Sequence, residues 1–253
     1  MDRLAVISAQ SQRLADAVAD VDPQRRCPTC PDWSAADLLW HIVHVQHFWA
    51  EILARNTLSD NDIPDIEASK PQRPPTVGEL LALRDAATRR LVEQLAAHDD
   101  EQPLWSWWPA EQTVGFTRRM QTYEATMHRI DAELTAGIDV MPIAPDLATG
   151  VIDHAVDVMW AWMPDAAVYE ARAVVELRAA DTGQRWFVEV GQWRAGDSAG
   201  ARGVRSTGAE ATATVTGTVD DLARWAWGRG GEVSVGGDPA AVAAMDAVLA
   251  VGM

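Results

Sequence analysis

The chain has 253 residues and is strongly acidic, with 37 Asp and Glu against 21 Lys and Arg and a formal net charge of −16. Such a surface repels phosphate backbones, so the composition argues against nucleic acid as a partner. No stretch approaches the ~20 consecutive apolar residues of a membrane-spanning helix, and the first residues lack a basic segment followed by a long apolar one. We therefore expect a cytoplasmic protein with no membrane partner.

The first part of the chain is predicted to be helical. Apolar residues recur at helical spacing over about residues 4–21, 34–55, 77–98 and 117–136. Ser34 followed by Asp37 is typical of a capping box, Thr76 fits a second N-cap, and Gly137 fits a C-cap glycine. The proline-rich residues 56–75 are expected to be loop. Four helices joined by such links indicate a four-helix bundle.

The pattern changes after about residue 142. A helix is expected at about 146–163, and apolar and polar residues then alternate as in strands. The expected strands are about 171–179, 184–193, 211–219 and 233–237, with helices at 220–227 and 239–250. We therefore predict an α+β protein with two domains, a helical bundle over 1–142 and a smaller mixed α/β domain over 143–253.

Cys27 and Cys30, the two cysteines, form a CPTCP segment. One Cys-x-x-Cys pair is compatible with half a zinc site or with a redox pair. The sequence has no second pair to close a structural zinc site, and no thioredoxin-like strand leads into this one. We expect a structural or incidental role in a loop that prolines stiffen.

The three histidines on the second predicted helix point in different directions around the helix axis. At about 100° per residue, His41 lies within the apolar arc of that helix, His44 at its edge and His47 outside it. A histidine that faces a bundle interior needs partners for its ring nitrogens. The ordinary alternative for His41 is a core histidine bonded to a carbonyl or carboxylate group.

The fourth predicted helix carries Glu124 and His128 at i, i+4 spacing, on the flank of its apolar side. Alone, such a pair can simply stabilise a helix. Together with His41 it forms a His₂Glu set, and three protein ligands leave positions open, as in catalytic metal sites. These ligands suit zinc, and nickel, iron and manganese stay open. Asp131, one turn after His128, is either a partner of its imidazole or a surface carboxylate.

Three tryptophans just before the fourth helix, Trp105, Trp107 and Trp108, could wall a pocket, although core or lid packing is favoured. Lys70 is the single lysine. This preference for arginine indicates a GC-rich genome, such as an actinobacterial one.

Three segments together resemble the family of mycothiol-dependent maleylpyruvate isomerases, related to DinB-like bundles. They are CPDWSAADLLWHIVHVQHFWA, GFTRRMQTYEATMHRIDAELTAG and ATATVTGTVDDLARWAWGRGGEVSVGGD, in the family's order. The resemblance implies a DinB-like metal-binding bundle followed by a sterol-carrier-like α/β domain. His41, Glu124 and His128 match the family's metal ligands, and Arg229 matches an arginine of the second domain that reaches the active site.

The resemblance also implies mycothiol as a thiol cosubstrate, which agrees with the actinobacterial composition. We therefore expect a metal-dependent enzyme, with zinc as the favoured ion, that activates a thiol for attack on a small electrophile. It would be an isomerase of the maleylpyruvate type or a thiol S-transferase, with Arg229 binding a carboxylate. A metal-dependent hydrolase and a non-catalytic small-molecule binder are the alternatives. We expect a monomer or weak homodimer.

Overall fold

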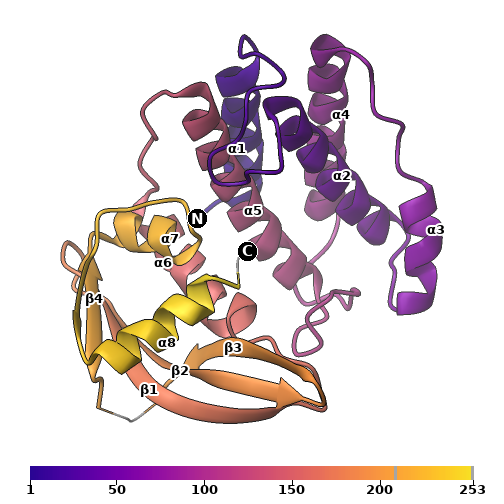
Figure 1. Cartoon of the computed structure of the whole chain (residues 1–253). Helices are drawn as coiled ribbons and strands as arrows, with labels where there is room; N and C mark the ends of the chain where they lie inside the picture. Colours follow the sequence, from indigo (N-terminus) through magenta and orange to yellow (C-terminus); the bar gives the residue numbers. More distant parts are fainter. Residues whose placement is uncertain (208–209, 252–253) are drawn as a thin grey trace. The chain divides into compact units, whose positions relative to one another are not determined.

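The chain divides into two compact units, Met1–Met141 and Pro142–Met253, called here the helical unit and the sheet unit (Figure 1). The computed structural model describes residues 1–207 and 210–251. The first unit is built from helices and the second contains a five-stranded sheet, so the predicted α+β class is confirmed. Among the described residues, no helix combines the length and the apolar character that crossing a bilayer requires.

Four long helices form the helical unit. They are α1 (Arg3–Val18), α2 (Ala35–Ala54), α4 (Val77–Ala96) and α5 (Val114–Ala136). Helix α1 packs on α5 and α2 packs on α4, while contacts of α1 with α4 and of α2 with α5 complete the bundle. Buried side chains such as Leu14, Leu38, Ile42 and Leu80 form its core. The apolar spacing that predicted four helices is therefore the spacing of their packed faces.

The ends of these helices follow their capping residues. The Ser34 hydroxyl accepts a hydrogen bond from the backbone N–H of Asp37, and the Asp37 carboxylate accepts from the backbone N–H of Ser34, which completes the predicted capping box. Gly137 ends α5 in the left-handed region, with a φ of 71°. Helix α5 begins at Val114, three residues earlier than predicted, because the side chain of Thr113 caps it.

The segment 56–75, predicted as loop, is partly helical. It contains a 3₁₀ turn, η1 (Asp60–Asp62), and a short helix, α3 (Ile63–Ala68). Pro64 lies in the first turn of α3, where a proline is tolerated, and Ile66 is fully buried. Of the prolines that predicted a loop, Pro64 therefore starts α3, and the others follow the end of this helix.

The sheet unit contains strands β1 (Val168–Ala179), β2 (Arg185–Ala195), β3 (Ser198–Arg205), β4 (Ala213–Gly217) and β5 (Ser234–Gly237). Its helices are α6 (Pro145–His154), α7 (Val219–Ala226) and α8 (Pro239–Leu249). The strand order is β3-β2-β1-β4-β5, and β1 and β4 run parallel while the other neighbours run antiparallel. Helix α8 lies against the sheet, and α6 packs on α7 (Figure 1).

Two features of the sheet unit differ from the prediction. Strand β3 was not expected, because its small and charged residues have low strand propensity; it forms by pairing with β2 along Val188–Ala195. The helix expected over 146–163 is α6 followed by a π-helical turn, η2 (Ala155–Met159).

Gly191 lies opposite a bulge in β1, where a Cβ atom would be 2.1 Å from the carbonyl oxygen of Glu170.

Candidate metal centre

His41, Glu124 and His128 come together in the helical unit. One potential ligand atom from each of the three side chains lies within 4.8 Å of the other two. His41 projects from α2, and the i, i+4 pair Glu124 and His128 projects from α5. His41 and Glu124 are 83 residues apart in the sequence, and the packing of α2 on α5 brings them together.

A single carboxylate oxygen lies between the two imidazoles. Glu124 Oε1 is 3.0 Å from His41 Nε2 and 3.2 Å from His128 Nε2. Metal–ligand distances of about 2.0 Å place neighbouring ligand atoms about 2.9–3.3 Å apart, so this spacing fits a shared ion. The two rings approach edge to face, with centroids 4.5 Å apart. The geometry therefore accommodates a dication with two nitrogen ligands and one oxygen ligand.

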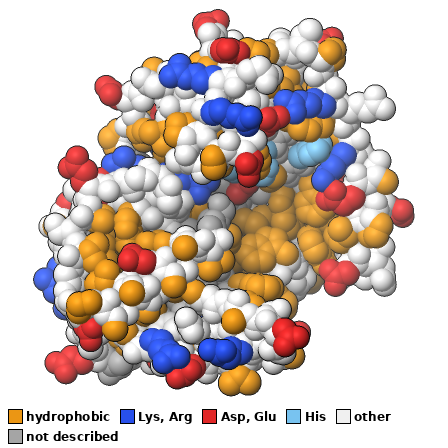
Figure 2. Space-filling view, in the orientation of Figure 1, with side chains coloured by type: hydrophobic (Ala, Val, Ile, Leu, Met, Phe, Trp, Pro, Cys, Tyr) orange, Lys and Arg blue, Asp and Glu red, His pale blue; other side chains and the backbone are white. Residues whose placement is uncertain are grey.

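The cluster is open on one side. The side chains of His41 and Glu124 are 26% and 25% exposed, whereas that of His128 is 8% exposed. Histidine side chains reach the visible surface of the helical unit (Figure 2). An ion held here would thus keep coordination positions that a small molecule can reach, as catalytic sites require.

Asp131 fixes the orientation of the His128 ring. Its Oδ2 lies 2.7 Å from His128 Nδ1, and the carboxylate is fully buried. A proton on Nδ1 would be donated to Asp131, which leaves Nε2 with a free electron pair on the side of Glu124. Of the two interpretations of Asp131 from the sequence, the imidazole partner agrees with the structure.

The electrostatics of the cluster favour a positive charge. Burial alone would lower the pKa of His128, but the charge of Glu124 and hydrogen bonds to Asp131 and Glu124 raise it to about 9. Burial would raise the pKa of Glu124, yet the charge and hydrogen bonds of His128 and His41 hold it well below its usual range. In the metal-free protein, His128 is therefore protonated and positively charged, and a bound metal ion would take the place of that charge.

The loop before α2 covers this site with residues that the sequence analysis did not select. The Trp33 ring lies 4.5 Å from the His41 ring and 5.9 Å from the His128 ring, between centroids. Thr29 donates a hydrogen bond of 2.5 Å to Asp131 Oδ1. Trp33 precedes the N-cap Ser34 and packs on the core around α2. An apolar residue just before a capping box often packs on the helix that follows, and this was the signal in the sequence that could have predicted the position of Trp33.

The same loop contains both cysteines. Hydrogen bonding, chiefly from Cys30 and also from Thr135 and Thr29, lowers the pKa of the Cys27 thiol to about 5, although burial and the charge of Asp131 act in the opposite direction. Both thiols are free of disulfide bonds; Cys27 is buried and Cys30 is partly exposed.

The other histidines lie apart from this cluster. His44 stacks on Trp40 with ring centroids 4.1 Å apart, and His47 Nε2 is 3.4 Å from the Ser69 hydroxyl. His98 Nδ1 bonds to the carbonyl oxygen of Gln94 at 2.7 Å. The helical geometry that separated His41 from His44 and His47 thus agrees with their positions.

Two of the three tryptophans make specific contacts within the helical unit. Trp105 stacks on Trp49 and donates to Asp60 at 2.6 Å, while the Nε1 of Trp107 is 3.1 Å from the Met120 sulfur. The side chains at 105, 107 and 108 are all partly exposed, so none of them lies in the buried core.

Arg229 belongs to the sheet unit. It follows the end of α7 and is 6% exposed. Its guanidinium donates to the carbonyl oxygen of Trp227 at 2.5 Å, and its backbone N–H donates to that of Arg224 at 2.8 Å. These contacts define the position of Arg229 within its own unit, and a role at the metal centre stays a prediction.

Comparisons with known proteins agree with this fold. The family model of the mycothiol maleylpyruvate isomerase N-terminal domain matches residues 4–133, just over half of the chain. Two crystal structures of the mycothiol-dependent maleylpyruvate isomerase, one with a histidine changed to alanine, are similar to the whole chain. The variant has a TM-score of 0.62 and the other structure 0.61; both are 14% identical, with 94% of each chain covered. A search of curated proteins found no match.

Proposed function

The chain belongs to the mycothiol maleylpyruvate isomerase family, and on this premise we propose that it is a metal-dependent enzyme that uses mycothiol to isomerise a small unsaturated acid. The observation that carries the proposal is the convergence of His41 and His128 on one oxygen of Glu124, at 3.0 and 3.2 Å. Three ligands from two helices, with one side open, are what a catalytic metal requires.

The residues present fit a dication such as Zn²⁺. His41, Glu124 and His128 would hold it, and the ion would supply the positive charge that keeps a thiol in its reactive thiolate form at neutral pH. Asp131 keeps the Nδ1 proton of His128, so that Nε2 stays available as a ligand. The Trp33 ring packs against the His41 ring, with centroids 4.5 Å apart.

The proposed reaction is an addition followed by an elimination. Addition of the thiol across a cis carbon–carbon double bond gives a single bond, rotation about that bond follows, and loss of the same thiol leaves the trans isomer. The thiol is regenerated and no electrons are lost or gained. We assign to Arg229 the binding of a substrate or thiol carboxylate, for which the planar guanidinium is well suited.

The test is turnover of maleylpyruvate by the zinc-loaded chain with mycothiol, followed by nuclear magnetic resonance of the cis and trans isomers. We expect isomerisation that depends on mycothiol and that His128→Ala abolishes. His98→Ala serves as the matched control, because His98 bonds to its own helix end and not to this cluster. Zinc content of each variant is measured by elemental analysis.

The outcomes separate the alternatives. A stable adduct of mycothiol in place of the trans isomer would identify an S-transferase. Hydrolysis of a test ester without any thiol would identify a hydrolase that activates water. A chain that binds no metal when purified without chelator would refute the metal centre, and Arg229→Ala with unchanged turnover would refute the role of Arg229.

A further inference from the structure

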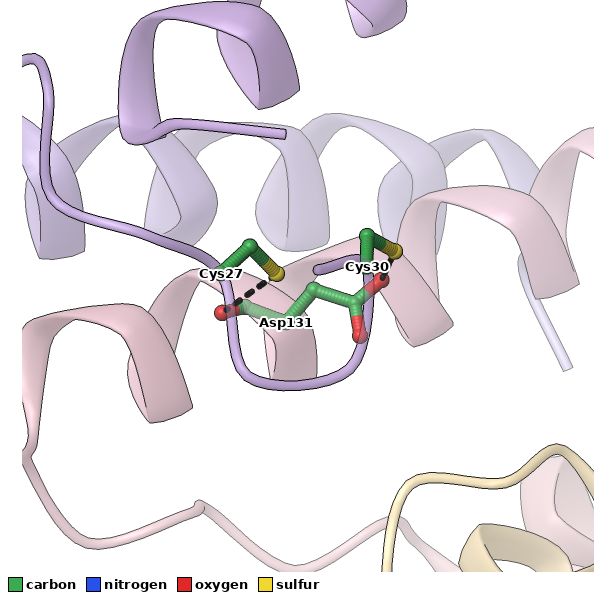
Figure 3. A group of neighbouring side chains, drawn as sticks. All are labelled: Cys27, Cys30 and Asp131. Atoms are coloured by element: carbon green, nitrogen blue, oxygen red, sulfur yellow. Dashed lines mark hydrogen bonds between the residues drawn. The ribbon is translucent and has the colours of Figure 1, made fainter. Parts of the chain in front are cut away.

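Cys27, Cys30 and Asp131 form a second cluster of possible metal ligands in the helical unit. Their two sulfur atoms and one carboxylate oxygen all lie within 4.8 Å of one another (Figure 3). The Cys30 sulfur is 3.9 Å from Asp131 Oδ2, and the Cys27 sulfur is 3.9 Å from the backbone carbonyl oxygen of Asp131. The cluster shares no residue with the set of His41, Glu124 and His128.

The loop that carries both cysteines is held in place on α5. The backbone N–H of Cys27 donates to the carbonyl oxygen of Trp33 at 3.0 Å, and that of Trp33 donates to the carbonyl oxygen of Cys30 at 2.8 Å. Between the cysteines, Thr29 bonds to Asp131 at 2.5 Å. The Cys30 sulfur thus faces the Asp131 carboxylate and the Cys27 sulfur faces the backbone carbonyl oxygen of the same residue (Figure 3).

We propose that Cys27, Cys30 and Asp131 bind a thiophilic divalent cation of the zinc type. The Cys-x-x-Cys spacing is that of zinc ligand pairs, and the structure supplies in Asp131 a third ligand that no sequence pattern indicated. Bond lengths of about 2.3 Å to sulfur and 2.0 Å to oxygen, in tetrahedral geometry, place ligand atoms about 3.5–3.8 Å apart. The Cys30 sulfur and Asp131 Oδ2 are 3.9 Å apart and no pair exceeds 4.8 Å, so each pair needs to close by at most about 1.3 Å.

Charge also favours a cation at this position. Cys27 and Asp131 are fully buried, and Cys30 is partly exposed. A dication bound here would stabilise the two thiolates and the carboxylate in this poorly solvated volume. The exposed side at Cys30 provides an entry path and leaves a fourth coordination position for water or a small thiol.

Asp131 can serve both clusters at once. Its Oδ2 lies 2.7 Å from His128 Nδ1 and 3.9 Å from the Cys30 sulfur. A carboxylate has about four acceptor positions on its two oxygens, so the hydrogen bonds with His128 and Thr29 do not by themselves exclude a metal bond. The second site does not depend on the proposed isomerase function, because its ligands are a separate set.

Cobalt substitution tests this proposal on the full chain, purified under reducing conditions and reconstituted with Co²⁺ alone. Thiolate ligands give a sulfur-to-cobalt charge-transfer band that nitrogen and oxygen ligands do not give. We expect this band in the wild type and in a His41→Ala/His128→Ala variant, and we expect Cys27→Ser/Cys30→Ser to lose it. Each double variant is expected to lose one of the zinc equivalents found by elemental analysis.

Two further measurements guard against a folding defect. Cys30→Ser alone changes the partly exposed thiol and should weaken zinc binding by about tenfold or more, with an unchanged circular dichroism spectrum. Absence of the band in the wild type, or a zinc content that the cysteine substitutions leave unchanged, overturns the proposal. A Cys27–Cys30 disulfide that persists with zinc present overturns it as well. A band that survives in the histidine variant supports this site even if the first metal centre fails.

Discussion

Metal binding by His41, Glu124 and His128 should weaken steeply as the pH falls. In the metal-free protein, burial would lower the pKa of His128, but its carboxylate neighbours raise it to about 9. His128 must release this proton before Nε2 can bind a metal. Below pH 9, each unit of pH therefore reduces the apparent affinity by about tenfold, or about 1.4 kcal/mol. Between pH 8 and pH 6 the expected loss is about 100-fold.

Competition with a chromophoric chelator, titrated with zinc at several pH values in this range, measures the effect. The chelator's own pH dependence is subtracted, and His98→Ala should follow the wild-type curve. Cys27→Ser/Cys30→Ser in the background removes any contribution from the second cluster. An affinity that is equal at pH 6 and pH 8 would show that His128 carries no proton that the metal must displace, and the electrostatic reasoning would fail.

Three other predictions follow from the same contacts. In the Cys27→Ser/Cys30→Ser background, Asp131→Asn removes the anionic partner of His128 and should weaken zinc binding by about 10–100-fold in calorimetry. Ser34→Ala removes the cap of α2 and should cost about 1 kcal/mol of unfolding free energy in urea, whereas Ser8→Ala, on an exposed turn of α1, should change little. The folded-state pKa of His128 is raised to about 9, so the stability that its proton contributes without metal is complete below about pH 6.5 and is lost as the pH rises through 9. The melting temperature of the metal-free protein should therefore fall over this pH range. A melting temperature that rises would contradict the reasoning.

Local signals in the sequence were sufficient to predict the helices that carry the site. The apolar spacing of α2 and α5, the capping box at Ser34 and the glycine at 137 are each readable from a few neighbouring residues. The pair Glu124 and His128 is local as well, because i, i+4 spacing fixes it on any helix. Strand β3 was missed for the opposite reason: its residues favour no strand, and only its pairing with β2 makes it one.

The convergence of distant segments was not readable from spacing alone. Periodicity places His41 within the apolar arc of its helix, but the partner that it meets depends on how α2 packs on α5. The sequence joined the three residues only through their ligand chemistry, as a possible His₂Glu set, and the resemblance to a family pointed to the same three. The contacts of Thr29 and Trp33 lie in an irregular loop, where no periodic pattern exists to predict a direction.

Helix α5 organises both clusters through its own geometry. At about 100° per residue, Glu124, His128 and Asp131 fall within an arc of about 60° on one side of the helix. The first two side chains approach His41 on α2, and the third approaches Cys27 and Cys30 in the loop that leads into α2. A buried carboxylate on a bundle helix is costly unless it is paired, and Asp131 is paired with both His128 and Thr29. A change at either cluster therefore acts on the same side chain, so zinc affinities of the first centre are compared only between variants that have the same residues at positions 27 and 30.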